Sequence, residues 1–200
     1  MNWQEVCENP SLQNLPFKIE LNERGQIVMS PTKVWHSAYQ GEIALLLNAL
    51  MKGGKILTEC AIETSKGTKV ADVAWASAGR FKRIRHEVAC SVAPEICVEV
   101  VSESNTQAEM DEKRRLCFEK GAKEAWFCDD YGTMSFYNPE GKLKKSVCCP
   151  GPYLCRRDGD LCIIETAAAA GQIRRRPGRK LQHRHPCPRP QVQRKNRRPP

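Results

Sequence analysis

The sequence EICVEVVS, residues Glu95–Ser102, contains the strongest strand signal in the chain. Its apolar residues form a nearly continuous run rich in valine and isoleucine, which is typical of a central strand covered on both faces. Glu99 interrupts that run. An ionised carboxylate removed from water is costly unless it is paired or bound to a cation. The segment therefore predicts a buried sheet and marks Glu99 as a candidate functional acid.

A helix is expected directly after this strand, from Thr106 to about Lys120, with Asn105 and Thr106 as capping residues. On such a helix Lys113 lies within the apolar stripe and not opposite to it. The apolar neighbours at spacings of three and four residues are Met110, Leu116 and Cys117. The simpler interpretation is a lysine whose ammonium extends past these neighbours into solvent. The alternative is a lysine that faces the sheet near Glu99.

Two more strands are expected before the central one, over Ile56–Glu63 and Lys69–Ala76. Asp72 lies inside the second of them, in the sequence VADVAW, just as Glu99 lies inside its own strand. Either acid alone is explained by a position at a strand end with its carboxylate in solvent. Two such acids in successive apolar strands weaken that explanation.

Two acids and a lysine on buried faces compensate one another, and they are also the charges that phosphodiester hydrolysis requires. A hard cation such as Mg²⁺ binds carboxylate oxygens and neutralises charge that develops on phosphate oxygens. A nearby lysine orients or helps to deprotonate the attacking water. This pattern favours a metal-dependent phosphodiesterase site at Asp72, Glu99 and Lys113.

The N-terminal part predicts a hairpin of Phe17–Leu21 and Gln26–Ser30, followed by a helix from Val34 to about Lys52. Glu42 lies at the edge of the apolar stripe of this helix. An ordinary flanking glutamate and a functional acid explain it equally well. His36 is interpreted as a helix-start or surface residue.

The remaining pattern predicts a basic surface loop over Ser77–Glu87, paired strands over Glu124–Asp129 and Thr133–Asn138, and an edge strand over Lys142–Cys148. The order is hairpin, helix, strands, helix, strands. It predicts an α/β or α+β sandwich in which helices flank a mixed central β-sheet.

The charge of the 200-residue chain is unevenly distributed. The formal net charge is +9, but residues 171–200 hold 11 of the 32 Lys and Arg residues and no acid, which leaves 21 basic and 23 acidic residues elsewhere, a net of −2. A basic DNA-binding domain is therefore not indicated. The segment 166–200 is rich in Arg and Pro and has no apolar period, so we expect it to be a disordered tail.

Composition also narrows the location of the protein. The longest apolar stretch, Ile43–Met51, is too short to span a membrane, and the first residues do not resemble a signal peptide. The chain has eleven cysteines, an odd number, and no CxxC pair. We interpret most of them as small core residues in a reducing cytoplasm.

Six segments occur in an order that resembles a known family. They are ERGQIVMSPT, WHSAYQGEI, VADVAWAS, PEICVEVVSESN, DEKRRLCFEKGAKEAWFCDD and MSFYNPEGKL. Together they resemble the Uma-type family of putative restriction endonucleases, a branch of the PD-(D/E)XK nuclease superfamily, over about Phe17–Lys145. The resemblance implies a restriction-endonuclease-like fold over residues 1–165, with the active site where two strands splay apart.

The resemblance also implies roles for four residues. Asp72 matches the aspartate of the PD element, Glu99 the acid of the ExK element, and Glu42 an acid often carried on the first helix. Asp72, Glu99 and Glu42 would then bind Mg²⁺ or Mn²⁺. Val101 stands where the strand lysine is expected, and Lys113 matches a lysine that has moved to the following helix.

Three functions are compatible with the sequence. The first is a magnesium-dependent DNA endonuclease, for which the resemblance implies a homodimer, since cutting two strands requires two sites. The second is a catalytically inactive protein of the same fold that binds nucleic acid or a protein partner. The third is a small protein whose Arg-rich tail binds nucleic acid independently of the core, which would be salt-sensitive and independent of base sequence. The four candidate residues favour the first over the second.

Overall fold

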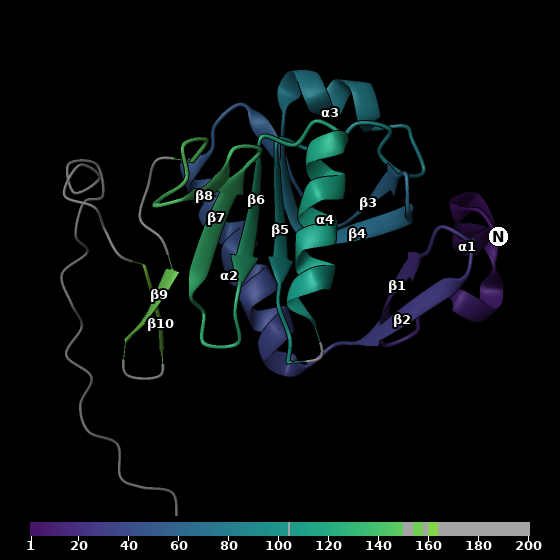
Figure 1. Ribbon diagram of the computed structural model, residues 1–200, viewed down its shortest axis with the longest axis horizontal. Coiled ribbons are helices and arrows are strands. Elements are labelled where there is room, and N and C mark those ends of the chain that lie inside the picture. The colour runs from purple at the N-terminus through teal and green to yellow at the C-terminus, as the bar shows by residue number, and fades with distance from the viewer. Residues whose placement is uncertain (104, 150–153, 158–159, 164–200) are drawn as a thin grey trace, which may run out of the picture.

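A six-stranded mixed β-sheet forms the centre of the computed structural model, which describes residues 1–103, 105–149, 154–157 and 160–163. The strand order is β3-β4-β5-β6-β7-β8 (Figure 1). β5 and β6 pair in parallel, and the other neighbours pair antiparallel. The strands are β3 (Gly54–Thr64), β4 (Gly67–Ser77), β5 (Ile96–Val100), β6 (Glu124–Cys128), β7 (Met134–Asn138) and β8 (Gly141–Leu143). The mixed sheet predicted from the sequence is confirmed.

Helices cover both faces of this sheet, with α4 (Gln107–Glu119) in front and α2 (Val34–Leu50) behind it in Figure 1. All five residues of β5 are buried, as the apolar run predicted. Alternate residues of β5 face the two helices: Val98 packs into the core beneath α2, and Cys97 packs into the core beneath α4. The strand at the centre therefore presents its side chains in turn to two separate apolar clusters.

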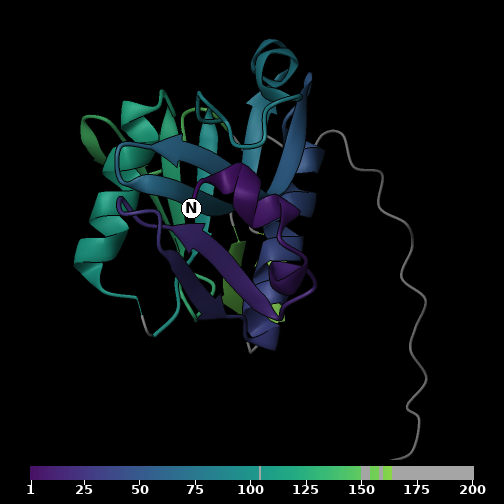
Figure 2. The same ribbon diagram turned by 90° about the vertical axis from the view of Figure 1, so that its right-hand side faces the viewer.

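The N-terminal hairpin consists of β1 (Phe17–Leu21) and β2 (Ile27–Pro31), which form a two-stranded sheet of their own. It follows the short helix α1 (Trp3–Glu8) and a 3₁₀ turn at Pro10–Leu12. β1 lies next to β4, and Figure 2 shows the hairpin in purple between α4 and α2. Because of this position, one side of the hairpin faces the central sheet.

One prediction about local structure is wrong. The segment expected to be an irregular loop contains the helix α3 (Ala78–Ile84). The side-chain oxygen of Ser77 caps it by accepting a hydrogen bond from the Arg80 amide at 3.3 Å. Ile84 is buried, and the partly buried Phe81 packs against the same core. The many basic residues give this segment the composition of a surface loop, although its N-cap and its two apolar residues stabilise a short helix.

The last strand of the central sheet is also shorter than predicted, since β8 ends at Leu143. The reason is the buried carboxylate of Glu124. It accepts hydrogen bonds from the amides of Val147 and Cys148 at 2.7 and 2.8 Å and from the Ser146 hydroxyl at 2.6 Å. These amides are therefore satisfied by a side chain and not by a strand ladder.

The C-terminal part of the described chain is a small separate hairpin of β9 (Leu154–Arg157) and β10 (Asp160–Ile163). The domain boundary expected at residue 165 and the tail expected over residues 166–200 lie outside the described residues. Within the described part of the chain, no helix is both long and apolar enough to cross a membrane.

Candidate active site

β4 and β5 stop pairing at the point where the two predicted acids lie. Their ladder covers Val73–Trp75 on one strand and Ile96–Val98 on the other. One step further along this register Asp72 lies across from Glu99, so the two side chains share one face of the sheet. Asp72 is fully buried, and its Oδ2 accepts a hydrogen bond from the amide of Val100 at 2.7 Å. The aspartate thus occupies the gap that opens where the strands separate.

The ladder on the other side of β4 is interrupted at the same level. Glu59 of β3 lies across from Asp72 and has a φ of 50°, a conformation that non-glycine residues rarely adopt. Gln40 of α2 donates hydrogen bonds from its Nε2 to the backbone oxygen of Asp72 at 2.8 Å and to Glu59 Oε1 at 2.5 Å. α2 therefore satisfies a backbone oxygen of Asp72 at the point where the neighbouring strand distorts, and unusual backbone of this kind is concentrated at functional sites.

Acids and lysines alternate across the site. Lys18 Nζ lies 2.7 Å from Asp72 Oδ1 and 3.0 Å from Glu99 Oε2. Lys113 Nζ lies 3.2 Å from the same oxygen of Glu99 and 2.8 Å from Glu20 Oε1. The structure thus brings Asp72, Glu99 and Lys113 together and adds Lys18 and Glu20 to them. Three carboxylates thus face two ammonium groups.

His36 belongs to this site: it lies at the start of a helix, as one interpretation of the sequence had it, but it is not a surface residue. It lies in the first turn of α2 and is buried, and its Nε2 is 3.3 Å from Asp72 Oδ2. Its Nδ1 is buried and has no hydrogen-bond partner. His36 and the Val100 amide both hold Oδ2, so the other carboxylate oxygen of Asp72 is the one directed at Lys18.

The two central acids differ in their electrostatics. Burial by itself raises the pKa of Asp72, but the hydrogen bonds and charges of His36 and Lys18 outweigh it and hold that pKa well below its ordinary value. Burial also raises the pKa of Glu99, and the charges of Lys113 and Lys18 offset this only in part. Asp72 is therefore the firmly ionised member of the pair.

Glu42 is not brought into this group. It lies on α2 and does not line the cleft around Asp72 and Glu99. Its Oε2 is buried without a hydrogen-bond partner. Burial, and after it the charges of Asp129 and Glu42, raise the pKa of the Cys128 thiol to about 12. The acid that does face the cleft beside Lys113 is Glu20, on β1.

A cleft of about 470 Å³ opens above these residues. The hairpin, the N-terminal end of α2 and the first turns of α4 form its walls. Besides the charged groups already described, its lining includes Lys33, Trp35, Lys69, Ser102 and Asn105. The walls also carry the acids Glu103, Glu109 and Glu112, and Glu103 pairs with Lys33. Lysines and acids thus both line the cleft, and a phosphate group would contact the lysines.

The donor set fits a hard divalent cation. Mg²⁺ is commonly bound through one or two carboxylates and keeps several waters. Asp72 and Glu99 offer two carboxylates from adjacent strands, and a positive group, the Lys18 ammonium, already lies between their oxygens. Among the described residues, no group of three or more His, Cys, Asp or Glu side chains forms a complete metal site. The pair would therefore hold such an ion together with water.

Nothing in the sequence indicates that Lys18 and Glu20 belong to the site, because charged and apolar residues alternate regularly along their strand. In the sequence FKIEL the charged residues alternate with apolar ones, which usually indicates a strand with one solvated face. The structure turns that charged face towards β4 and the cleft. The signal that could have identified them is the need for positive charge beside two buried acids.

A mixed sheet with paired acids where two strands splay apart defines the class of nuclease-like folds. Residues 3–151 match the model of the Uma2 family, described as "Putative restriction endonuclease". The chain belongs to this family. A solved structure described as a putative nuclease belonging to DUF820 from Anabaena variabilis has a similar fold, with a TM-score of 0.57, 22% identity, and coverage of 70% of this chain and 80% of that chain. No curated protein matches the chain.

Proposed function

We propose that the protein is an endonuclease that hydrolyses phosphodiester bonds of cytoplasmic DNA with the help of Mg²⁺ or Mn²⁺. The observation that carries this proposal is the pair of buried carboxylates, Asp72 and Glu99, at the splayed strands, with a cation already between them. Membership of the Uma2 family supports nuclease chemistry.

The proposed roles follow from the contacts. Asp72 and Glu99 would hold the cation, and a bound Mg²⁺ would supply charge neutralisation on the phosphate and a more acidic water. His36 and the Val100 amide hold Asp72 in place through Oδ2. Lys113 is fixed between Glu20 and Glu99 and provides the positive charge that Val101 cannot provide on the strand. Its ammonium would orient the attacking water or stabilise the phosphate.

The alternative is a nuclease-fold protein that binds nucleic acid or a protein without cutting it. The observation that favours this alternative is the internal charge compensation, since the two lysines neutralise most of the acidic charge in the site. The two functions differ in one measurable property. The endonuclease requires a divalent cation, and the binding protein does not.

The test is a cleavage assay on supercoiled, linear and single-stranded DNA in Mg²⁺, Mn²⁺ or EDTA. Asp72→Asn keeps the size of the side chain and removes its charge, so we expect the rate to fall about 1,000-fold or more. Glu63→Gln is the matched control, because Glu63 is an exposed acid on the neighbouring strand β3. Cleavage that persists in EDTA, or in the Asp72 variant, would contradict the proposal.

Both strands of a duplex are cut most directly by two copies of the site, so we propose that the active form is a homodimer. The check is the order in which products form from supercoiled DNA. A dimer with two active sites produces linear molecules with little accumulation of nicked circles, and a single site produces nicked circles first.

A further inference from the structure

Lys18 occupies the position between the two acids at the base of the cleft. Its Nζ contacts Asp72 Oδ1 at 2.7 Å and Glu99 Oε2 at 3.0 Å, one oxygen from each of two adjacent strands. The side chain of Lys18 is only 11% exposed. A positive group that bridges two carboxylates in this way stands where a divalent cation would have to bind.

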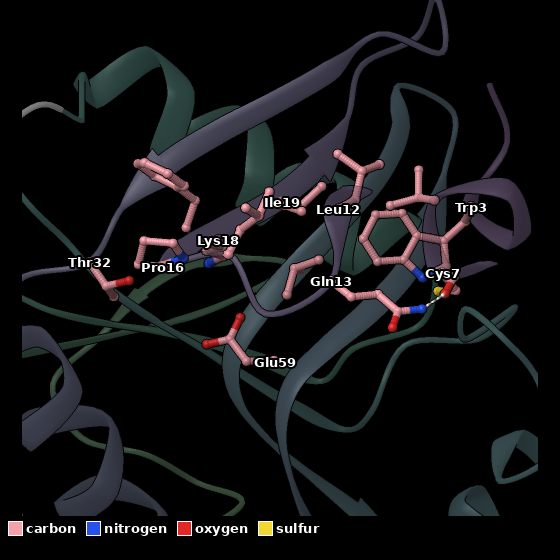
Figure 3. Close-up of a pocket in the computed structure, with 13 residues that line it drawn as sticks. Trp3, Cys7, Leu12, Gln13, Pro16, Lys18, Ile19, Thr32 and Glu59 are labelled. Carbon is pink, nitrogen blue, oxygen red and sulfur yellow. Dashed lines mark hydrogen bonds between the residues drawn. The ribbon is translucent and has the colours of Figure 1, made fainter. Parts of the chain in front are cut away.

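The surroundings of Lys18 hold its ammonium at that position. The residue also borders a second pocket of about 360 Å³ (Figure 3). The lining of this pocket is mostly apolar and includes Trp3, Leu12, Pro16 and Ile19. Glu59 also lines this pocket, but the ammonium contacts Asp72 and Glu99, so the mostly apolar lining contacts the stem of the side chain while the two carboxylates hold its charged end.

Lys18 and a divalent cation cannot share these oxygens. Mg²⁺ binds carboxylate oxygens at about 2.0–2.1 Å, and an ammonium group held at the same two oxygens would lie within a few Å of it. Like charges at that separation in a poorly solvated site repel each other strongly. The three carboxylates at the site are also too few to balance a dication together with both lysines.

We propose that Lys18 is an internal cation that Mg²⁺ or Mn²⁺ must displace, so that this lysine sets the affinity of the site for divalent cations. The inference rests on the proposed function, because it assumes that Asp72 and Glu99 bind the ion. The displaced ammonium remains on a strand that lines the cleft, where it faces the phosphate groups of a bound nucleic acid.

Lys113 does not have this role, although it also contacts Glu99. It makes no ion pair with Asp72, and its shorter contact is with Glu20, at 2.8 Å. Glu20 is itself fixed by the Val70 amide, which donates a hydrogen bond to it at 3.0 Å. Lys113 therefore keeps a partner when Glu99 turns to a cation, whereas both carboxylate partners of Lys18 are the proposed ligands.

The test measures Mn²⁺ affinity by electron paramagnetic resonance in wild type, Lys18→Met, Lys18→Arg and Lys69→Met. Because the competing charge is removed, the dissociation constant of Lys18→Met for Mn²⁺ should be about tenfold or more below that of wild type. Lys18→Arg keeps the charge and should bind Mn²⁺ no more tightly than wild type. Lys69→Met is the matched control, since Lys69 lines the same cleft but makes no ion pair with either acid, and its affinity should change less than about twofold.

A second measurement remains informative even if Lys18→Met folds poorly when no cation is bound. The melting temperature of Lys18→Met should be below that of wild type in EDTA, because two buried acids lose their partner, and Mn²⁺ should raise it more than it raises that of wild type. If Lys18→Met binds Mn²⁺ no more tightly than wild type, while Asp72→Asn abolishes binding, then Lys18 does not compete with the cation. The proposed function is not contradicted by that result. If folded wild type and Lys18→Met both fail to bind Mn²⁺ at millimolar concentration, the inference and the metal-dependent function fall together.

Discussion

Each acid at the base of the cleft is matched to a particular basic side chain. Asp72 meets Lys18 and His36, Glu99 meets both lysines, and Glu20 meets Lys113. Loss of one partner of a buried ion pair is more costly than loss of both, because an uncompensated charge remains. The phenotypes of single variants therefore depend on which charge they leave unpaired, and charge-balanced double variants are the cleaner test.

Lys113→Met tests whether the helix lysine acts in the reaction. We expect the cleavage rate to fall about 100-fold or more, because the positive charge beside the cation site is removed. We also expect the free energy of unfolding to fall by about 3 kcal/mol, since Glu20 and Glu99 lose an ion pair. Cleavage assays and urea titrations give the two quantities. Arg115→Met, an exposed change on the same helix, should affect neither.

The double variant Lys113→Met with Glu20→Gln separates catalysis from folding. It removes one positive and one negative charge, so most of the lost stability should return while the cleavage rate stays low. A double variant that cleaves DNA at the wild-type rate would show that Lys113 has only a structural role.

The candidate site was predictable from the sequence wherever a charge interrupts an apolar pattern. Asp72, Glu99 and Lys113 each occupy such a position, and the structure brings their side chains to one place. Lys18 and Glu20 follow the regular alternation of their strand, which carries no sign that its polar face meets the sheet. Their location depends on how the hairpin docks, which is a tertiary property.

At the scale of elements, the segment after β8 is held by one carboxylate. Glu124 is 1% exposed and also accepts a hydrogen bond from the Trp126 indole at 2.7 Å, so four donors converge on its two oxygens. Glutamine in its place presents an amide group to two of these donors. Glu124 thus fixes the chain at Ser146–Cys148 against the end of the sheet.

Glu124→Gln should lower the free energy of unfolding at pH 7 by about 3 kcal/mol, because two hydrogen bonds to a charged group are removed. Burial by itself raises the pKa of Glu124, but the hydrogen bonds from Ser146, Cys148, Trp126 and Val147 outweigh it and lower that pKa below 4.5. A lowered folded-state pKa contributes stability above the unfolded value, and that stability is lost as the pH falls through the folded value.

The difference between wild type and Glu124→Gln should therefore be largest at neutral pH and shrink below about pH 4.5. Urea titrations across this range measure it. Glu140→Gln, in the exposed turn before β8, is the control and should show no such pH dependence. A difference that stays constant down to pH 3 would mean that the carboxylate charge of Glu124 does not hold the segment.

The elements that sequence patterns identified are those whose residues carry their own signal. β5 is apolar throughout apart from Glu99, and α4 has a capping box in which Thr106 and Glu109 bond each other's backbone amides. α3 and the short β8 depend on distant partners, the apolar core for Ile84 and the Glu124 carboxylate for the amides of Val147 and Cys148. A local pattern cannot contain such partners.

At the scale of the whole molecule, the positive charge is unevenly distributed along the chain. Residues 1–170 have a net charge of −2, from 21 basic and 23 acidic residues, and the 11 basic residues of 171–200 account for the positive total. The family match covers residues 3–151 and ends before this basic segment. The lysines of the cleft are accompanied by acids, so the positive charge in excess lies in residues 171–200 and not around the cleft.

Truncation after Thr166 separates the contribution of the basic segment from that of the cleft. We expect the melting temperature to change by less than about 2 °C, because a segment without an apolar pattern has little to bury. Binding to duplex DNA should weaken at low salt, and the plot of log K against log salt should become shallower by about 0.9 for each phosphate group that the basic segment no longer neutralises.

A full-length variant with the eleven Lys and Arg residues changed to Gln should bind like the truncated chain, since charge and not length attracts the DNA. Metal-dependent cleavage should persist in both variants at low salt, because the acids and lysines of the cleft are intact. A large fall in melting temperature, or cleavage that disappears with the segment at every salt concentration, would show that residues 167–200 belong to the folded domain.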